Sequence, residues 1–196
     1  MIFEKIKLRA PEPEDLAILY KWENDSSVWQ ISNTLTPFSK YTLKRYIEKS
    51  HKSIFETGQL RFMIDIADKG HTIGTIDLFD FDAFHLRAGV GILIADKGER
   101  RKGYAAMALK ALINYCFEHL MLHQLYCNIT EDNTASVNLF TKTGFTAIGN
   151  KKDWIKTKDG FKDEVMYQII NIPDNQHFRI ISTSGSSVCI RMFTPL

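Results

Sequence analysis

The sequence predicts a mixed α/β (α+β) fold in which helices flank a mostly antiparallel central sheet. The first observation is a series of three apolar segments of strand length, at 61–67, 71–81 and 89–95. Turn and loop residues separate them, which is typical of consecutive antiparallel strands. The second observation is a set of apolar residues at helical spacing from Ala105 to Leu120, the pattern of an amphipathic helix.

The residues before these strands predict one short strand and two helices. Lys7–Ala10 has the pattern of a strand, and prolines follow it. Acidic residues at 12–15 favour the start of a helix. A second helix is expected to begin after Pro37–Ser39 and to extend toward Phe55. The polar and aromatic segment 26–36 is expected to form a loop.

The long helix follows a strand directly through a short basic turn. Gly91–Ala95 is the strand, and Arg100, Arg101, Lys102 and Gly103 form the turn. Glycine lets the backbone approach a bound group, and the first amides of a helix bind anions. The turn therefore suits a pyrophosphate, although an ordinary basic turn with solvated charges fits the same residues. No Walker-type phosphate loop is present in the sequence.

Beyond the long helix, the sequence predicts a strand, a short helix and two final strands. The strand is 124–130, and Asn133 is a suitable N-cap for the helix that follows. Gly144 is expected to end this helix. The last strands are expected at 145–148 and 164–170.

Length and composition indicate one globular domain. The 196 residues carry a formal net charge of +2, which gives no reason to expect a nucleic-acid partner. No apolar run is long enough to cross a membrane, and no signal peptide is recognisable at the first residues. A cytoplasmic location is the resulting expectation.

The cysteines and the C-terminal residues add little to the functional prediction. The spacing of Cys116, Cys127 and Cys189 is not that of a metal site, so no metal is expected. Cys116 and Cys127 are predicted to be buried thiols of the core. Residues 1–170 form the predicted domain. Residues 171–196 form an extension that is either an added hairpin or a loosely held tail.

Two motifs resemble those of the GNAT superfamily of acetyl-CoA-dependent N-acetyltransferases. The first is Arg100-x-x-Gly103-x-Ala105. The second follows about thirty residues later and reads Asn133-x-x-Ser136-x-x-Leu139-Phe140-x-Lys142-x-Gly144-Phe145. The resemblance spans about residues 5 to 170 and is closest to the branch with ribosomal-protein and spermidine N-acetyltransferases. It implies a sheet in which two neighbouring strands splay apart and a pocket for the acceptor lined by the first two helices.

The resemblance also implies which residues bind acetyl-CoA. The backbone of Ile92, Leu93 and Ile94 would pair with the pantetheine arm, and an N–H near Ile92 would stabilise the oxyanion. The remaining predicted contacts are Arg100, Arg101, Lys102, Gly103, Tyr104, Ala105, Asn133, Ser136, Phe140 and Lys142.

Direct acetyl transfer to an amine needs a proton donor for the thiolate and a base for the amine. Many relatives have a tyrosine at the position of Phe140, which has no proton to give. Ser136 is the predicted donor, with water as the alternative. Asp77 is the predicted base, with Asp80, Glu23 and Asp25 as the other candidates.

Acidic residues are expected to attract a cationic acceptor amine. Glu23, Asp25 and Asp80 are the predicted acceptor-binding residues. A strand-capping, solvated role remains open for Asp80 and Asp82, and His85 beside them is a possible proton relay or simply exposed.

The sequence therefore predicts an acyltransferase that acetylates a primary amine of a polyamine, another small molecule or a protein N-terminus. The alternative is a catalytically weak CoA-binding sensor or scaffold, which the missing tyrosine favours. A homo-oligomer is also left open.

Overall fold

The computed structural model describes residues 1–27, 29 and 34–172, which form one mixed sheet with helices on both faces. The strands are β1 (Ile2–Phe3), β2 (Ile6–Arg9), β3 (Leu60–Ile66), β4 (His71–Asp82), β5 (Arg87–Ile94), β6 (Gln124–Thr130), β7 (Thr146–Thr157) and β8 (Gly160–Ile170). The helices are α1 (Leu16–Glu23), α3 (Lys40–Lys49), α4 (Ile54–Thr57), α5 (Tyr104–Asn114) and α6 (Thr134–Lys142). Short 3-10 turns precede α1 and α5, and a π-helical turn, Tyr115–His119, continues α5.

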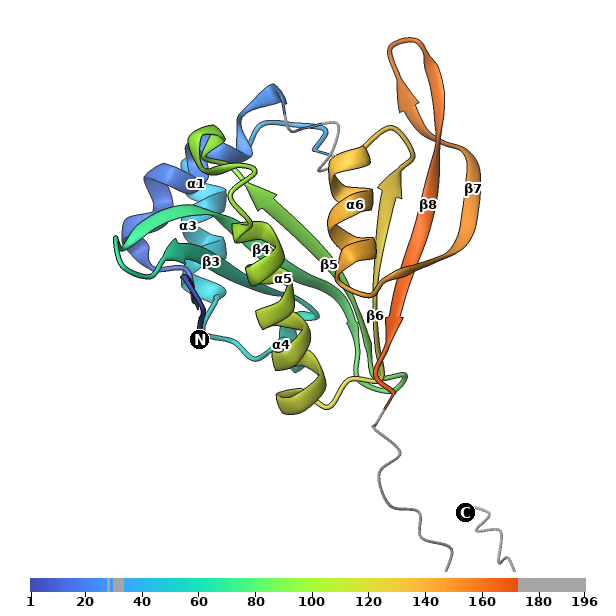
Figure 1. The fold of residues 1–196 in the computed structure, drawn as a ribbon. Coiled ribbons are helices and arrows are strands. Elements are labelled where there is room, and N and C mark those ends of the chain that lie inside the picture. The colour runs from blue at the N-terminus through green and yellow to red at the C-terminus, as the bar shows by residue number, and fades with distance from the viewer. Residues whose placement is uncertain (28, 30–33, 173–196) are drawn as a thin grey trace, which may run out of the picture.

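The sheet confirms the predicted mostly antiparallel architecture. Its strand order is β1-β2-β3-β4-β5-β6-β8-β7, and β5 with β6 is the parallel pair in it. That pair is short, because Arg87–Gly89 lies against Gln124–Tyr126 and the pairing goes no further. Beyond it the two strands diverge, as Figure 1 shows. The resulting opening is the splayed strand pair that the resemblance implied.

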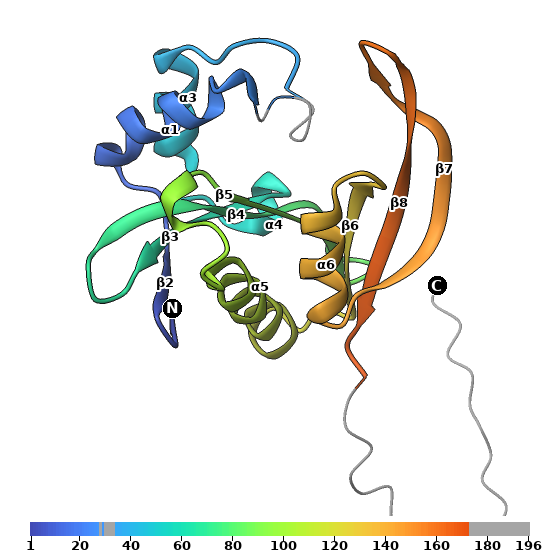
Figure 2. The same ribbon diagram turned by 45° about the horizontal axis from the view of Figure 1, so that its top comes forward.

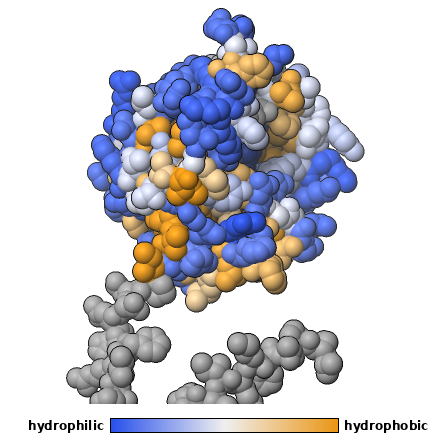
Figure 3. Space-filling model, turned by 90° about the vertical axis from the view of Figure 1, so that its right-hand side faces the viewer, coloured by the Kyte–Doolittle hydropathy of each residue, from blue (hydrophilic) through white to orange (hydrophobic). Residues whose placement is uncertain are grey.

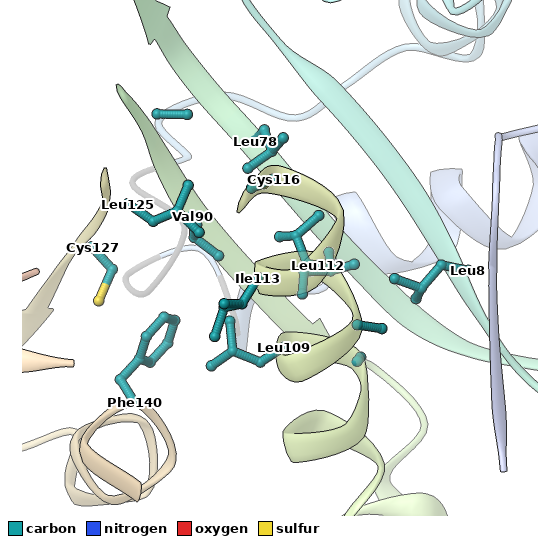
Figure 4. Packing of buried hydrophobic residues seen from close by; sticks show 14 of the residues in the cluster. Leu8, Leu78, Val90, Leu109, Leu112, Ile113, Cys116, Leu125, Cys127 and Phe140 are labelled. Atoms are coloured by element: carbon teal, nitrogen blue, oxygen red, sulfur yellow. The ribbon is translucent and has the colours of Figure 1, made fainter. Parts of the chain in front are cut away.

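The two faces of the sheet are covered by different helices (Figure 2). α1 and α3 cover one face through a small core of Leu19, Leu43, Ile47 and Met63. α5 and α6 lie on the other face, over the main core. There the ring of Phe140 points from α6 toward Leu109, Ile113 and Cys127, among the residues of Figure 4.

Three predicted boundaries were wrong, each for a local reason. The helix expected to extend toward Phe55 ends at Lys49, and α4 begins separately with Ser53 in a capping box. β7 continues to Thr157 instead of ending at residue 148, because two register shifts keep it paired with β8. β8 correspondingly begins at Gly160. The two strands form a hairpin that projects beyond its neighbours in Figure 1.

Other local predictions were confirmed. The Asn133 side chain accepts a hydrogen bond from the Ser136 backbone and caps α6, and Gly144 follows the helix with φ 101°. Cys116 and Cys127 are buried free thiols.

Residues 173–196 of the predicted extension, and residues 28 and 30–33 of the predicted 26–36 loop, fall outside the described residues. Within the described part of that loop, Ser26, Ser27 and Trp29 are helical, so the loop prediction was wrong there, whereas residues 34–36 lie in no helix or strand.

The described part of the chain has three further features, which concern its surface, its helices and its metal-binding side chains. On the side of the molecule toward β7 and β8, apolar residues form separate patches among hydrophilic ones (Figure 3). Within the described ranges, every helix is too short or too polar to cross a membrane. The same ranges contain no group of three or more His, Cys, Asp and Glu side chains arranged to hold a metal ion.

Candidate active site

A cavity of about 660 Å³ lies where β5 and β6 separate. Residues from α1, β3, β4 and β5 line one side of it, and residues from β6, α6, β7 and β8 line the other. Gly91, Ile92 and Leu93 expose the edge of β5 to the cavity. Because β5 has no strand partner on this side beyond Gly89, its backbone groups are free to bind an extended ligand.

One wall of the cavity is an ion cluster centred on Arg61, which we call the Arg61 cluster. The guanidinium donates to both oxygens of Asp77, at 2.7 and 2.9 Å, and also pairs with Glu23. The ring of Tyr46 lies 5.4 Å from Arg61. Burial alone would lower the pKa of Arg61, but the charges of Asp77 and Glu23 and the hydrogen bonds from Asp77 raise it above its ordinary value.

The Arg61 cluster changes the expectation for Asp77. Arg61 lies directly opposite Asp77 in the β3–β4 pair, and Glu23 reaches the same face from the end of α1. Both oxygens of Asp77 already accept hydrogen bonds from the Arg61 guanidinium, so a substrate proton would have to compete with these bonds. The geometry therefore favours an electrostatic role for Asp77 over the predicted role as base.

The opposite wall carries a second ion pair. Glu164 of β8 is buried, with 9% of its side chain exposed, and pairs with Lys151 of β7 at 2.9 Å. The Lys151 ammonium also donates to the side-chain oxygen of Asn128 at 2.9 Å. The ring of Trp154 lies 5.2 Å from the same ammonium. All four residues line the cavity.

The charges that line the cavity do not balance. Three carboxylates, from Glu23, Asp77 and Glu164, face the two cations Arg61 and Lys151, which leaves a net charge of −1. The Lys151–Glu164 pair is neutral, so the excess negative charge belongs to the Arg61 cluster. A cavity of this charge attracts a cationic ligand.

The predicted phosphate loop lies at the start of α5. Gly103 is the N-cap of the helix with φ 87°, and no side chain caps the first-turn amides. These amides have no partner within the helix and lie at its positive end. Arg100 donates to the Ile94 carbonyl at 2.8 Å and ties the loop to β5, while Lys102 pairs with Glu99. Together with exposed Arg101, the loop fits a pyrophosphate group.

The second motif places its residues along α6 beside the cavity. Asn133, Ser136 and Phe140 line the cavity, and the Ser136 backbone N–H donates to Asn133 at 3.2 Å. The Ser136 hydroxyl is thus separate from the capping bond. Phe140 is 3% exposed and packs edge-on against Phe145, with ring centroids 5.0 Å apart. It forms an apolar boundary of the cavity.

The predicted phosphate-loop residues and Ile94 do not line the cavity, and three further predicted residues also lie outside its lining. Lys142 is exposed in the last turn of α6. Asp25 follows the end of α1, and its carboxylate accepts from the Ser27 backbone. Asp80 lies at an irregularity of β4 with φ 48°, and its carboxylate accepts from Tyr126 at 3.3 Å. The expectation that Asp25 and Asp80 bind the acceptor therefore has no support in the geometry.

Sequence reasoning missed Arg61, Lys151 and Glu164. A signal for Arg61 was present, because Arg61 and Asp77 are each eight residues from Lys69 at the centre of the predicted hairpin turn. Residues equidistant from a hairpin turn lie opposite each other. The Lys151–Glu164 pair had no such signal, because β7 was predicted to end before Lys151.

Known proteins similar to this chain share its domain and fold. The sequence matches the acetyltransferase (GNAT) domain over residues 5–146. It is 29% identical over 170 residues to p20 of Bacillus licheniformis, an uncharacterized N-acetyltransferase, covering 85% of this chain and 93% of p20. It is 27% identical over 147 residues to the spermidine N(1)-acetyltransferase of Escherichia coli, with 74% of each chain covered.

Solved structures of N-acetyltransferases have a fold similar to that of this chain. The crystal structure of spermidine N-acetyltransferase from Vibrio cholerae in complex with CoA and spermine has a TM-score of 0.76 at 24% identity, covering 85% of this chain and 96% of that one. A dodecameric structure of the Vibrio cholerae enzyme has a TM-score of 0.71 at 25% identity, covering 85% and 94%.

Proposed function

Since the chain belongs to the GNAT acetyltransferase family, we propose that this acetyl-CoA-dependent N-acetyltransferase acts on a primary amine of a small, polyamine-like cation. The observation that carries the proposal is the negatively charged cavity at the opening between β5 and β6. An acidic, partly enclosed site favours a small cationic acceptor. Similarity to spermidine N-acetyltransferases of Escherichia coli and Vibrio cholerae supports the same acceptor class.

Acetyl-CoA supplies the activated acetyl thioester, and residues on one side of the opening would hold it. The amides at the start of α5 and the basic loop around Gly103 would bind the pyrophosphate. The edge of β5 at Ile92 and Leu93 would pair with the amides of the pantetheine arm. At Ile94, the third residue of this prediction, the carbonyl already accepts a hydrogen bond from Arg100. Bound in this way, the thioester would reach the cavity that Ser136 and Phe140 line.

The acceptor amine would enter from the side of the Arg61 cluster. Glu23 and Asp77 would attract it as an ammonium ion, and water in the cavity would take its proton, because both oxygens of Asp77 are engaged by Arg61. The neutral nitrogen then attacks the thioester carbonyl carbon, and a backbone N–H near Ile92 stabilises the negative charge that develops on the oxygen. The carbon–sulfur bond then breaks, and the Ser136 hydroxyl would protonate the departing thiolate. The proton that remains in excess on the new amide nitrogen would return through water to Ser136, which restores the hydroxyl and completes the balance.

A homo-oligomer belongs to the same proposal. Its support is the likeness to the dodecameric structure of the Vibrio cholerae enzyme, at 25% identity. Multi-angle light scattering of the purified protein would give the number of subunits. On the sequence grounds given above, the cytoplasm is the proposed location.

The experiment that tests the acceptor class measures thiol release from acetyl-CoA against a panel. The panel contains spermidine, spermine, butane-1,4-diamine, butylamine, an aminoglycoside and peptides with free N-termini. Turnover with the small amines and none with the peptides is expected. Turnover with the peptides alone would replace the proposal with protein N-terminal acetylation.

A further inference from the structure

The acceptor cavity contains an ammonium group that belongs to the chain itself. The Lys151 ammonium is bound by the Glu164 carboxylate and the Asn128 amide oxygen, each at 2.9 Å, with the Trp154 ring 5.2 Å away. We call Glu164, Asn128 and Trp154 the ammonium cage. All three residues line the cavity, as Lys151 does.

The ammonium cage has the chemistry of a binding site for a primary amine. A carboxylate supplies the opposite charge, an amide oxygen accepts one N–H, and an aromatic ring supplies a cation–π contact. Nothing in this set is particular to a lysine side chain. The ammonium of a bound ligand would make the same three contacts in the same place.

We propose that the ammonium cage is a second ammonium subsite of the acceptor cavity, and that Lys151 is its internal occupant and a specificity-determining residue. The inference rests on the proposed function, because it concerns how that cavity selects its amine. The cage lies on β6, β7 and β8, whereas the Arg61 cluster lies on α1, β3 and β4. A linear diamine entering the cavity therefore meets the anionic Arg61 cluster at one end and the neutral Lys151–Glu164 pair at the other.

Lys151 determines whether a second ammonium group of the acceptor can bind to the ammonium cage. The excess negative charge of the cavity lies in the Arg61 cluster, since Lys151 neutralises Glu164. The cavity of the native protein consequently binds one ammonium group favourably. A second ammonium must displace Lys151, so the lysine reduces the advantage that a diamine has over a monoamine of the same length.

The test compares butane-1,4-diamine with butylamine in the Lys151→Met variant. Methionine keeps most of the side-chain volume and leaves the Glu164 charge for the ligand. We expect the ratio of kcat/KM for the diamine to that for the monoamine to rise about tenfold, and the ratio of the two affinities in calorimetry to rise with it. An unchanged ratio in both measurements would overturn the proposal.

Lys152→Met is the matched control. Lys152 is the next residue of β7 and also pairs with a β8 carboxylate, Asp163. Its side chain is 76% exposed, and neither partner lines the cavity. Loss of the same charge at this site should leave the diamine-to-monoamine ratio unchanged. An equal rise in both variants would indicate a general charge effect and would overturn the proposal.

A charge-neutral double variant distinguishes a specific effect of the Lys151 charge from a loss of stability. Lys151→Met leaves a buried carboxylate without its partner, which is destabilising. Glu164→Gln leaves the lysine charge uncompensated and should lower the diamine-to-monoamine ratio. The double variant Lys151→Met/Glu164→Gln is neutral and should return the ratio to about the native value. A double variant that keeps the raised ratio would exclude the ammonium cage as its cause.

Failure of the proposed function and failure of this inference give different results. Absence of turnover by the native protein with every small amine would contradict the proposed function. The calorimetric ratio of diamine to monoamine binding does not need turnover, and it still decides the role of Lys151.

Discussion

Single side chains set the charge of the acceptor cavity through their ion-pair partners. Two of the three carboxylates in the cavity wall have a cationic partner across a strand pair, as Asp77 has Arg61 and Glu164 has Lys151. In both cases the two residues lie opposite each other in the sheet. Removal of one partner leaves a partly buried charge uncompensated, so these positions affect ligand binding and stability together.

Ser136→Ala tests the proposed proton donor. The substitution removes the hydroxyl but keeps the backbone N–H that Asn133 caps, so the start of α6 should remain intact. We expect kcat to fall by about tenfold to a hundredfold with little change in acetyl-CoA affinity. Steady-state kinetics and calorimetry measure the two effects.

Thr141→Ala removes an exposed hydroxyl from the same helix and is the control. An unchanged kcat for Ser136→Ala would assign the proton donation to water.

Gly89 is required by the ring of Phe79. A Cβ atom at Gly89 would lie 2.3 to 2.7 Å from that ring, whereas at Gly91 the nearest atom is 3.8 Å away. Gly89→Ala should therefore lower the free energy of unfolding by about 1–3 kcal/mol, measured by urea denaturation. Gly91→Ala is the matched control and should change stability by much less. Equal losses in the two variants would contradict this role of Phe79.

At the scale of whole elements, the site depends on how α5 begins and on where β5 leaves β6. The left-handed Gly103 begins α5 without a side-chain cap, which leaves the first amides for an anion. The short pairing of β5 with β6 leaves the β5 edge open toward the cavity. The start of α5 thus supplies the anion-binding part of the proposed cofactor site, and β5 supplies the open strand edge.

Gly103→Asp tests the anion site of α5. A carboxylate at the N-cap would occupy the first-turn amides and repel the pyrophosphate. Gly103→Asn is its neutral counterpart of nearly equal size, and both substitutions meet the same strained φ of 87°. We expect acetyl-CoA affinity, measured by calorimetry, to fall at least about tenfold more for aspartate than for asparagine. Equal affinities would remove the loop from the cofactor site.

At the scale of the whole molecule, the sheet separates two cores, and the main core encloses the structural thiols. Cys116 on the π-helical turn and Cys127 on β6 both belong to the core between the sheet and its α5–α6 face. Burial raises the pKa of each thiol to about 12. The reactive thiolate is therefore scarce at neutral pH.

Alkylation should consequently report on the integrity of this core. In native protein at pH 8, iodoacetamide is expected to leave Cys116 and Cys127 unmodified, since only about one thiol in ten thousand is ionised when the pKa lies four units higher. Both should react once urea unfolds the chain. Peptide mass spectrometry separates the two sites from Cys189, and rapid native labelling of either one would contradict the buried state.

Features that depend on neighbouring residues in the chain were predictable from the sequence. These include the three antiparallel strands β3, β4 and β5, the Asn133 cap, and the glycine turn before α5. Each is determined by side-chain periodicity or by backbone preferences within a few residues. The family motifs lie in the same local segments, which is why the acetyltransferase class and the splayed strand pair could also be inferred.

The composition of the cavity was decided by the tertiary structure. Glu23, Asp77 and Glu164 come from three distant elements, and Asp25 and Asp80 lie close in sequence to two of them yet turn away. The ammonium cage exists because register shifts extend β7 and place Lys151 opposite Glu164. Strand register and helix packing bring such groups together, and both depend on contacts across the whole sheet that no local pattern encodes.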